Sequence, residues 1–276
     1  MIKPIINQIS EKTLLAIANK MPQSLLLTGE SGVGLSTISC YLAELRKIKP
    51  IVILPEKDDK IDLEKGVISV DIMRRLYDET RTKTSGERII IIDYAERMTH
   101  QAQNAFLKLL EEPGKGIYFI LVSHSISKLL PTILSRTEKL EIRPITNAQS
   151  EQLLNSLGIT DKVKRSQLLF MAEGRPAELT RLCSDDIYFE NQSSIIKDSR
   201  ELIRGNLYQK LLIINGYKDN RPAALTLLLG IANILKRSII TNPQADAINR
   251  IEAVLYAYQQ VEANGNIRLI LARMIL

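Results

Sequence analysis

The strongest constraint on the fold is the glycine-rich segment GESGVGLST at 29–37, which directly follows the apolar run SLLLT at 24–28. A strand, a glycine-rich turn and a helix in this order form a phosphate-binding loop, because the glycines let backbone N–H groups point at an anion and the helix adds its positive dipole end. The expected loop positions are Gly29, Gly32, Gly34, Ser36 and Thr37. The segment therefore predicts an α/β nucleotide-binding architecture.

The first half of the chain alternates short apolar runs with amphipathic stretches. The apolar runs have the length and composition of buried strands, and they occupy 24–28, 50–54, 66–70, 88–93 and 116–122. The amphipathic stretches space their apolar residues as one helix face does, and they occupy 36–48, 70–83 and 99–112. Strands that alternate with helices predict a doubly wound parallel sheet.

The second half has helical periodicity. After a polar interval at 184–194, long apolar helices are predicted at 221–240 and 246–264. The apolar run LTLLLGIANIL inside the first of them is shorter than the roughly 18 uninterrupted apolar residues of a membrane span, so we interpret it as the core of a helix bundle. The pattern predicts domains at 1–145, 146–187 and 188–276.

Composition narrows the class of protein further. The net charge of +6 and the pI of 9.2 suit contact with a polyanion without requiring it. Two distant cysteines, Cys40 and Cys183, cannot form a disulfide framework or a four-cysteine zinc site, and His100 and His124 have no ligand at metal spacing. The start MIKPIINQISEKT lacks the apolar core of a signal peptide. We expect a cytoplasmic protein with no metal site, no zinc and no membrane anchor.

The nucleotide site predicted by the loop lacks two catalytic residues. A working loop carries a lysine after Gly34 that places its charge on the β- and γ-phosphates, and this chain has Leu35. The run RIIIID ends in Asp93, which is placed to hold magnesium, but Tyr94 follows where a glutamate would orient the attacking water. We interpret Glu96 as a solvated or dipole-stabilised carboxylate. Hydrolysis is predicted to be lost, while binding of ATP or ADP without hydrolysis stays open.

A resemblance to a known family begins at the run IIIIDYAERMTHQAQNAFLKLLEEPGKGIYFILVSHSISKLLPTILSRT, residues 89–137, which resembles the AAA+ subunits of bacterial DNA polymerase III clamp loaders. AEGRPAEL at 172–179 is similar to that family's sensor-2 segment, and NGNIRLILARMIL at 264–276 to the last helix of its collar. The resemblance implies an AAA+ P-loop parallel sheet domain, a small helical lid domain and an all-α C-terminal collar domain.

Within this family the defective loop looks most like the delta-prime subunit, which keeps the AAA+ fold without turning over ATP. Two departures from the family pattern are present. The four-cysteine zinc module that usually follows the loop helix is missing between Cys40 and Pro50, and Thr137 replaces the cysteine of the SRC motif.

The resemblance also implies roles for single residues. Arg136 in SRT falls at the arginine finger that reaches the γ-phosphate of a neighbour's ATP, with a solvated surface charge or a weak ion pair as the alternative. Ser123 and Arg175 fall at the two sensor positions, with a strand-end cap and a structural ion pair as the alternatives. Arg74 and Lys108 fall roughly where such subunits contact DNA phosphates, with solvated surface as the alternative.

The leading hypothesis is a non-hydrolysing subunit that helps load the sliding clamp onto primed DNA. Its expected partners are gamma/tau-type ATPases, a delta-type subunit and, through the complex, the sliding clamp and primer-template DNA. The alternative is an active gamma/tau-type ATPase with a variant Walker A loop, in which a Lys or Arg from elsewhere replaces the loop lysine. A helicase loader or initiator is disfavoured, because the C-terminal region has no recognisable helix-turn-helix.

Overall fold

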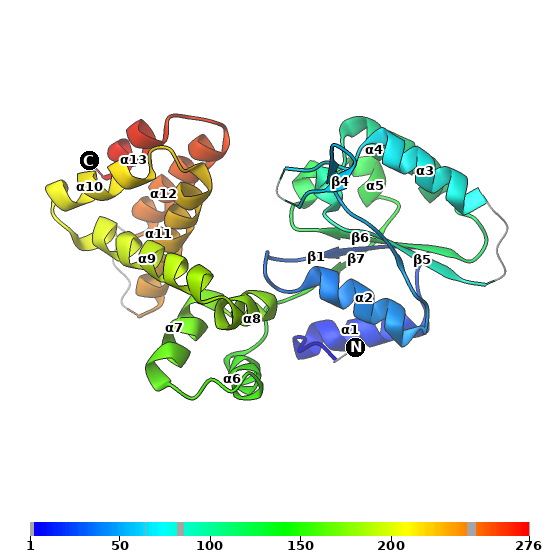
Figure 1. Cartoon of the computed structure of the whole chain (residues 1–276), viewed down its shortest axis with the longest axis horizontal. Helices are drawn as coiled ribbons and strands as arrows, with labels where there is room; N and C mark the ends of the chain where they lie inside the picture. Colours follow the sequence, from blue (N-terminus) through cyan, green and yellow to red (C-terminus); the bar gives the residue numbers. More distant parts are fainter. Residues whose placement is uncertain (1–2, 64, 82–85, 242–246, 276) are drawn as a thin grey trace. The chain divides into compact units, whose positions relative to one another are not determined.

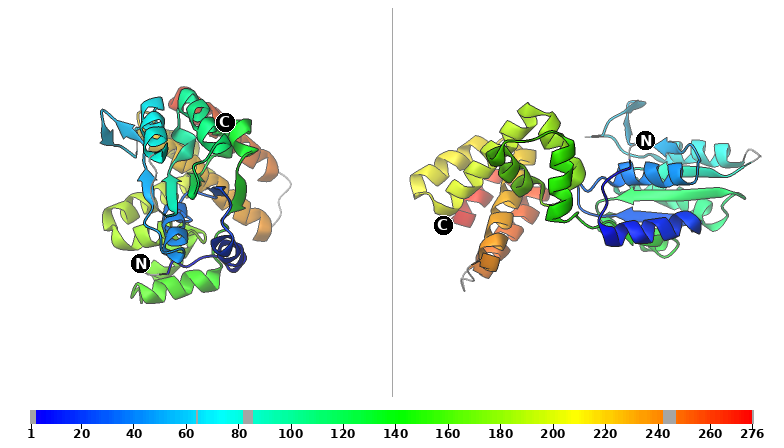
Figure 2. Two further views of the ribbon diagram at one scale, coloured as in Figure 1. Left: turned by 90° about the vertical axis from the view of Figure 1, so that its right-hand side faces the viewer. Right: turned by 90° about the horizontal axis from the view of Figure 1, so that it is seen from below.

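The computed structural model consists of two compact units, residues 1–184 and 185–276. It describes residues 3–63, 65–81, 86–241 and 247–275 (Figure 1). The strands of the described chain all lie in the N-terminal unit, and the described part of the C-terminal unit consists of helices joined by short loops (Figure 2).

A five-stranded parallel sheet forms the centre of the N-terminal unit. Its strands, in the spatial order β2-β5-β6-β1-β7, are β1 (Ser24–Thr28), β2 (Ile51–Ile53), β5 (Arg88–Ile92), β6 (Ile117–Ser123) and β7 (Glu138–Glu141). The central strands β1, β5 and β6 are rich in Leu and Ile and almost wholly buried, as strands covered on both faces must be.

Helices cover both faces of this sheet (Figure 1). They are α1 (Gln8–Asn19), α2 (Leu35–Leu45), α3 (Val70–Arg81), α4 (His100–Glu111) and α5 (Pro131–Leu134). Leu25 and Leu27 of β1 pack in one core cluster with α1 and α2, whereas Leu26 packs in the other with α3, α4 and α5. This alternation follows from the two-residue period of a strand, and it fixes which helices cover which face.

One predicted strand is wrong. The run 66–70 does not join the sheet, because Val67 and Ile68 form only isolated bridges, to Glu56 and Met98. Val70 already begins α3. The run is apolar because Ile68 is fully buried in the core cluster that contains α3, α4 and α5. Composition alone cannot distinguish such a buried segment from a strand of the sheet.

The edge strand β7 is absent from the sequence prediction. Its sequence EKLE has only Leu140 buried, so it carries no apolar run. It is a strand because its backbone pairs with β1 from Leu25 to Thr28. A small hairpin of β3 (Glu56–Lys57) and β4 (Lys60–Ile61) was likewise not predicted.

Three short helices complete the N-terminal unit: α6 (Asn147–Ser156), α7 (Lys162–Ala172) and α8 (Pro176–Ser184). Thr146 and Gln149 form a reciprocal capping box at the start of α6, which satisfies backbone N–H groups that a helix start leaves free. The Asp161 side chain caps α7 by accepting a hydrogen bond from the Lys164 backbone N–H at 2.7 Å. The predicted small helical segment after residue 145 is therefore present as helices.

The C-terminal unit contains α9 (Asp186–Arg204), α10 (Leu207–Tyr217), α11 (Arg221–Thr241), α12 (Ala247–Glu262) and α13 (Ile267–Ile275). Its core centres on α11, whose Leu227 and Leu228 are fully buried. Ser199 of α9 donates to the Leu227 carbonyl at 3.2 Å, and a Cβ on Gly230 would lie 2.6 Å from the Ser199 hydroxyl oxygen. The predicted order of a parallel α/β sheet followed by helices is confirmed.

Helix α11 is also apolar and long enough, over Arg221–Ile239, to cross a membrane by length and composition. A single such helix is weak evidence, because a core helix of a globular unit passes the same test. Leu227, Leu228 and Ile231 of α11 lie in the core of the C-terminal unit, and 28% of the apolar stretch is buried.

The two units meet in sequence between Ser184 and Asp185, close to the predicted boundary after residue 187. That prediction falls inside α9, which begins at Asp186 with Asp185 as its N-cap. The other predicted boundary, after residue 145, lies within the N-terminal unit and just before α6.

We expect a polypeptide that ends after Ser184 to fold without the C-terminal unit. Both core clusters around the sheet are built from residues between Ile6 and Ile142, so the truncation removes none of their contacts. Circular dichroism and thermal unfolding test this, with the full chain as the reference. A truncated chain that shows no cooperative unfolding transition would contradict the division into two units.

Candidate functional site

The candidate site lies at the carboxyl edge of the sheet, where β1, β5 and β6 end together. Thr28 pairs with Ser123 in register, and Asp93 directly follows β5. Helix α2 leaves β1 toward one face, and α5 follows β6 on the other face (Figure 1). Where the helices that follow neighbouring strands cover opposite faces of an open α/β sheet, a crevice forms at the carboxyl ends of those strands. Ligands usually bind in this crevice.

The loop that follows β1 needs its glycines for two different reasons. Gly32 and Gly34 have φ of 91° and 88°, a left-handed conformation that side chains with a Cβ rarely adopt. A Cβ on Gly29 would lie 2.7 Å from the carbonyl oxygen of Ile142. The phosphate-loop turn predicted from sequence is present, and α2 begins directly after Gly34.

Leu35 stands at the first position of α2, where a working loop carries lysine. Its side chain is 1% exposed and belongs to the core cluster between α2 and the sheet. A Cβ on Gly29 would lie 3.5 Å from Leu35 Cδ2, so the leucine packs beneath the loop backbone. The residue supplies apolar packing in the place from which a cation would contact phosphate.

Ser36 and Asp93 form the polar part of the site that has been retained. Asp93 is 5% exposed, and its burial raises the pKa of its carboxyl above the ordinary value of 3.8. Hydrogen bonds from Ser36 and from the Tyr94 backbone N–H, the latter at 3.0 Å, lower that pKa but by less than burial raises it. A hydroxyl beside a carboxylate is the donor pair that P-loop proteins offer to Mg²⁺, so these two residues fit the ion.

Tyr94 occupies the position of the water-orienting glutamate. Its φ is 54°, in the left-handed region, so the backbone turns sharply into the short helix η1 (Ala95–Arg97). The ring packs edge-on against His124, with centroids 6.2 Å apart, and lies 5.3 Å from the Arg97 guanidinium carbon. Burial raises the pKa of its phenol, so it is no substitute for a carboxylate base.

Of the two alternatives for Glu96, the solvated carboxylate is wrong, whereas the residue does lie in the first turn of η1, as dipole stabilisation requires. Glu96 Oε1 accepts a hydrogen bond from the His124 backbone N–H at 3.4 Å, and Oε2 is buried without a partner among the described residues. His124 Nδ1 in turn lies 3.0 Å from the Gly29 carbonyl oxygen. Glu96 and His124 therefore link the ends of β5 and β6 to the phosphate loop. The position of His124 directly after a strand end was the sequence signal for this.

Ser123 is fully buried at the end of β6, where its Oγ accepts from the Ser125 N–H at 3.2 Å. The strand-end cap that the sequence left open as an alternative is thus present in the structure. Ser123 still shares the carboxyl edge with Asp93, so a sensor role stays a prediction.

Helix α8 contacts the phosphate loop through its N-terminus. The backbone N–H groups of Ala177 and Glu178 donate to the Gly32 carbonyl at 2.9 and 3.1 Å. Arg175 donates to the Ser31 carbonyl at 3.4 Å and to the carbonyls of its own region, at Ala172 and Met171. The ion pair expected as the alternative for Arg175 is replaced by these carbonyl contacts, and sequence gave no sign of the backbone contacts to Gly32.

Arg136 lies away from the other site residues. It precedes β7, which runs parallel to β1 with Glu138 opposite Leu25, whereas the phosphate loop follows the far end of β1 at Thr28. Arg136 is therefore at the opposite edge of the sheet from its own loop, about 10 Å or more along the strand direction. Its side chain is 38% exposed and pairs with Glu111 at 2.8 Å.

The candidate DNA contacts are exposed residues on helices α3 and α4. Arg74 is paired with Asp71 at 3.2 Å and its side chain is 71% exposed. Lys108 is exposed. Neither lies at the carboxyl edge of the sheet, so their role in DNA binding stays a prediction. Among the described residues no group of three or more His, Cys, Asp or Glu side chains is placed to hold a metal ion.

Comparison with known proteins gives a match of residues 47–146 to the family model described as DNA polymerase III, delta subunit. The chain is 24% identical to DNA polymerase III subunit delta' of Bacillus subtilis, over 70% of this chain and 66% of that protein. It is 30% identical to the same subunit of Pseudomonas aeruginosa, over 55% of this chain and 45% of that protein. The chain is similar in sequence to the clamp-loader AAA+ family. The resemblance to this family that the sequence motifs carry is confirmed.

A similar fold in a solved structure extends over nearly the whole chain. A DNA polymerase III gamma subunit-related protein of Thermotoga maritima has a solved structure that covers 96% of this chain with a TM-score of 0.59 and 20% identity. That likeness concerns the fold alone. The matched segments span less than two thirds of the length of the two delta' relatives, so activity and partners do not follow from the match.

We expect Asp93→Asn to stabilise the chain at neutral pH. Burial raises the pKa of Asp93 in the folded state above its unfolded value of 3.8, so the unfolded chain loses this proton first and the ionised form costs folding free energy. The cost is present above the folded pKa and disappears as the pH falls below about 3.8. Thermal unfolding at pH 7 and near pH 3.5 measures the difference.

The matched control for this experiment is Asp219→Asn, which changes an exposed carboxylate in the same way. It is expected to leave the melting temperature unchanged at both values of pH. If Asp93→Asn melted at or below the temperature of the unmodified chain at pH 7, the carboxylate would be a stabilising group, and the assignment of its burial as a cost would be wrong.

Proposed function

We propose that this chain is a delta-prime-like subunit of a DNA polymerase III clamp loader that does not hydrolyse ATP. It helps to load the sliding clamp onto primed DNA, and it completes the ATPase site of a neighbouring subunit with Arg136. Such a subunit works in the cytoplasm with gamma/tau-type ATPases and a delta-type subunit. The observation that carries the proposal is Leu35, which is 1% exposed and packed in the core where the phosphate-contacting lysine belongs.

The loss of hydrolysis is supported by two independent positions. Leu35 provides no charge for the γ-phosphate, and Tyr94 provides no carboxylate for the attacking water. The glycine turn, Ser36 and Asp93 persist, so backbone donors and a magnesium-type donor pair still suit a bound diphosphate. We therefore propose that any ATP or ADP binds without being hydrolysed.

The trans role of Arg136 is supported by its place in the fold. The residue is partly exposed and lies at the far edge of the sheet from its own loop, so it is unsuited to act in cis. Its partner Glu111 is 51% exposed, and a surface pair of this kind contributes only about 0–1 kcal/mol. The guanidinium can therefore exchange Glu111 for a phosphate at small cost.

The alternative function is that of an active gamma/tau-type ATPase. It is favoured by one observation, that Arg175 contacts the loop at Ser31 and is a cation beside the phosphate site. The same guanidinium also donates to the carbonyls of Ala172 and Met171, which directs it into the turn before α8. We prefer the non-hydrolysing role because Tyr94 remains in either case.

We expect Leu35→Lys to give no ATPase activity and to lower stability. The new lysine replaces a side chain that is buried in the core, which costs on the order of 2–5 kcal/mol, and Tyr94 still leaves the water unoriented. Leu35→Met is the matched control, because an apolar side chain of similar volume costs less than about 1.5 kcal/mol. Turnover by Leu35→Lys comparable to that of an active motor subunit would show that only the lysine was missing.

We expect Arg136→Ala to leave folding and assembly intact and to lower the DNA- and clamp-stimulated ATPase of the complex. The affected neighbouring site should lose on the order of a thousandfold in rate, and Arg136→Lys should rescue little because lysine lacks the planar fork. Lys139→Ala, which removes an exposed cation on nearby β7, is the control. If the complex with Arg136→Ala hydrolysed ATP and loaded clamps at the unmodified rate, Arg136 would be an ordinary surface residue.

A further inference from the structure

Gln103 of α4 is a buried polar residue that the candidate site does not use, and it is 4% exposed. A long amide side chain is usually exposed, because its donors and its acceptor lose their hydrogen bonds to water on burial. Here backbone groups replace the water. Gln103 Nε2 donates to the carbonyls of Met98 and Lys128 at 3.3 and 3.0 Å, and Oε1 accepts from the Leu130 N–H at 2.8 Å. Both polar ends of the side chain are therefore satisfied inside the protein.

Two of the backbone groups that Gln103 holds belong to the chain between β6 and α5, residues 124–130, which we call the β6–α5 connection. Lys128 ends the short helix η2 (Ile126–Lys128), and Leu130 is the N-cap of α5. They lie 25 and 27 residues away from Gln103 in sequence. One side chain thus fastens the β6–α5 connection to the first turn of α4.

Arg136 is attached to this connection through α5. Its backbone N–H donates to the Ile133 carbonyl at 3.0 Å, and its guanidinium donates to the Thr132 carbonyl at 3.2 Å. Helix α5 has only four residues, so it depends on contacts with the rest of the fold. Gln103 holds the start of α5, and the ion pair of Arg136 with Glu111 holds its end. Helix α4 therefore fixes the segment that carries Arg136 at two points.

These two points differ in burial. The side chains of Arg136 and Glu111 are 38% and 51% exposed, so their ion pair can give way to water or to a phosphate. The hydrogen bonds of Gln103 are buried, and water cannot replace them unless the core opens. When the guanidinium leaves Glu111 for a phosphate, Gln103 still holds the start of α5. A side chain that acts on a neighbour's phosphate must be placed to within about 0.5 Å, so its base has to be rigid.

We propose that Gln103 is a positioning residue for Arg136. It keeps the β6–α5 connection, and with it α5, at a fixed place on α4, so that the guanidinium reaches the neighbour's phosphate from a rigid base. The inference rests on the proposed function of Arg136, and it adds the residue through which the core of this chain controls that side chain. Gln103 acts through the β6–α5 connection and not by contact with a reacting atom.

The test assembles full-length Gln103→Met and Gln103→Glu with the gamma/tau-type and delta-type subunits of the same organism. Methionine has a similar length and removes all three hydrogen bonds. Glutamate keeps the acceptor for the Leu130 N–H but turns a second oxygen toward the two carbonyls. The control is Gln101→Met, which makes the same change at an exposed residue of the same helix.

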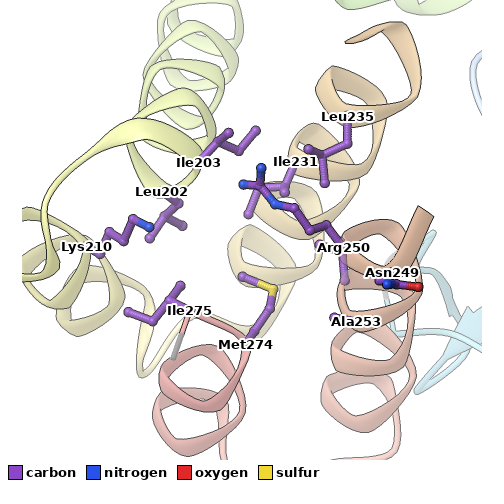
Figure 3. Close-up of a pocket in the computed structure, with 11 residues that line it drawn as sticks. Leu202, Ile203, Lys210, Ile231, Leu235, Asn249, Arg250, Ala253, Met274 and Ile275 are labelled. Carbon is purple, nitrogen blue, oxygen red and sulfur yellow. The ribbon is translucent and has the colours of Figure 1, made fainter. Parts of the chain in front are cut away.

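Thermal unfolding of the isolated full chain shows whether each variant folds. The reference for this measurement is Asn249→Met, which removes an amide from α12 in the C-terminal unit and leaves the N-terminal unit unchanged. Asn249 is exposed and lines a hollow of about 420 Å³ there (Figure 3), which has room for the new side chain. A variant counts as folded when its melting temperature lies above the temperature of the ATPase assay.

We expect both Gln103 variants to enter the complex and to lower its maximal DNA- and clamp-stimulated ATPase rate, by roughly half or more of the decrease that Arg136→Ala causes. The ATP concentration at half-maximal rate should change less than about twofold, because an arginine finger acts on the transition state. In the Arg136→Ala background, Gln103→Met should cause no further decrease, because its effect passes through a side chain that is already removed. Gln101→Met should leave the rate unchanged.

Each other outcome decides against the inference. If both folded Gln103 variants support the unmodified rate while Arg136→Ala lowers it, this inference is wrong and the proposed function stands. A further decrease in the Arg136→Ala background would show that Gln103 acts by another route and would overturn the inference in the same way. If Arg136→Ala itself has no effect, the proposed role of Arg136 fails and this inference fails with it. If neither Gln103 variant folds, the residue serves folding and not positioning, and the inference fails.

Discussion

The packing of Leu35 beneath the phosphate loop is the interaction on which the rest of the site depends. The loop keeps its left-handed glycines and leads into α2, but its first helical side chain is part of the hydrophobic core. A lysine at this point would have to be solvated or paired with phosphate, whereas leucine stabilises the loop by apolar burial. The same substitution that removes the charge needed for catalysis therefore supports the fold of the loop without a ligand.

The polar groups that remain around the loop are joined to one another. Ser36 bonds to Asp93, Glu96 accepts from the His124 backbone, and the Gly32 carbonyl accepts from the start of α8. These contacts connect the ends of β5 and β6, the loop and the helical part of the N-terminal unit. An arrangement with no catalytic lysine can thus still hold these parts of the N-terminal unit in a fixed relation, which the role proposed for Arg136 requires.

The sequence predicted those parts of the fold that rest on local pattern. Apolar runs identified β1, β5 and β6, because a strand buried on both faces is apolar throughout. Helical spacing identified α2, α4 and α11, because a helix with one buried face repeats its apolar residues every three to four positions. It did not predict β7, which is a strand only through its pairing with β1, and it mistook the buried run at 66–70 for a strand of the sheet. Both depend on contacts distant in sequence.

Some features of the candidate site could likewise be predicted from local sequence, and others could not. The loop glycines, Leu35 and Asp93 were predicted because a motif of fixed spacing carries them. The environment of Glu96 and the contact of α8 with Gly32 were not, since they depend on backbone groups brought together by the fold. The ion pair of Arg136 with Glu111 joins a loop to the end of α4, and no spacing rule predicts it.

We propose that the architecture of a nucleotide site persists here without its chemistry. The most direct measurement is steady-state ATP hydrolysis by the purified full chain, with Asp93→Ala as the control for a contaminating ATPase. Leu35 and Tyr94 together predict no turnover above that control, with or without DNA. Turnover by the unmodified chain that Asp93→Ala abolishes would contradict the claim and identify the protein as an ATPase with a variant loop.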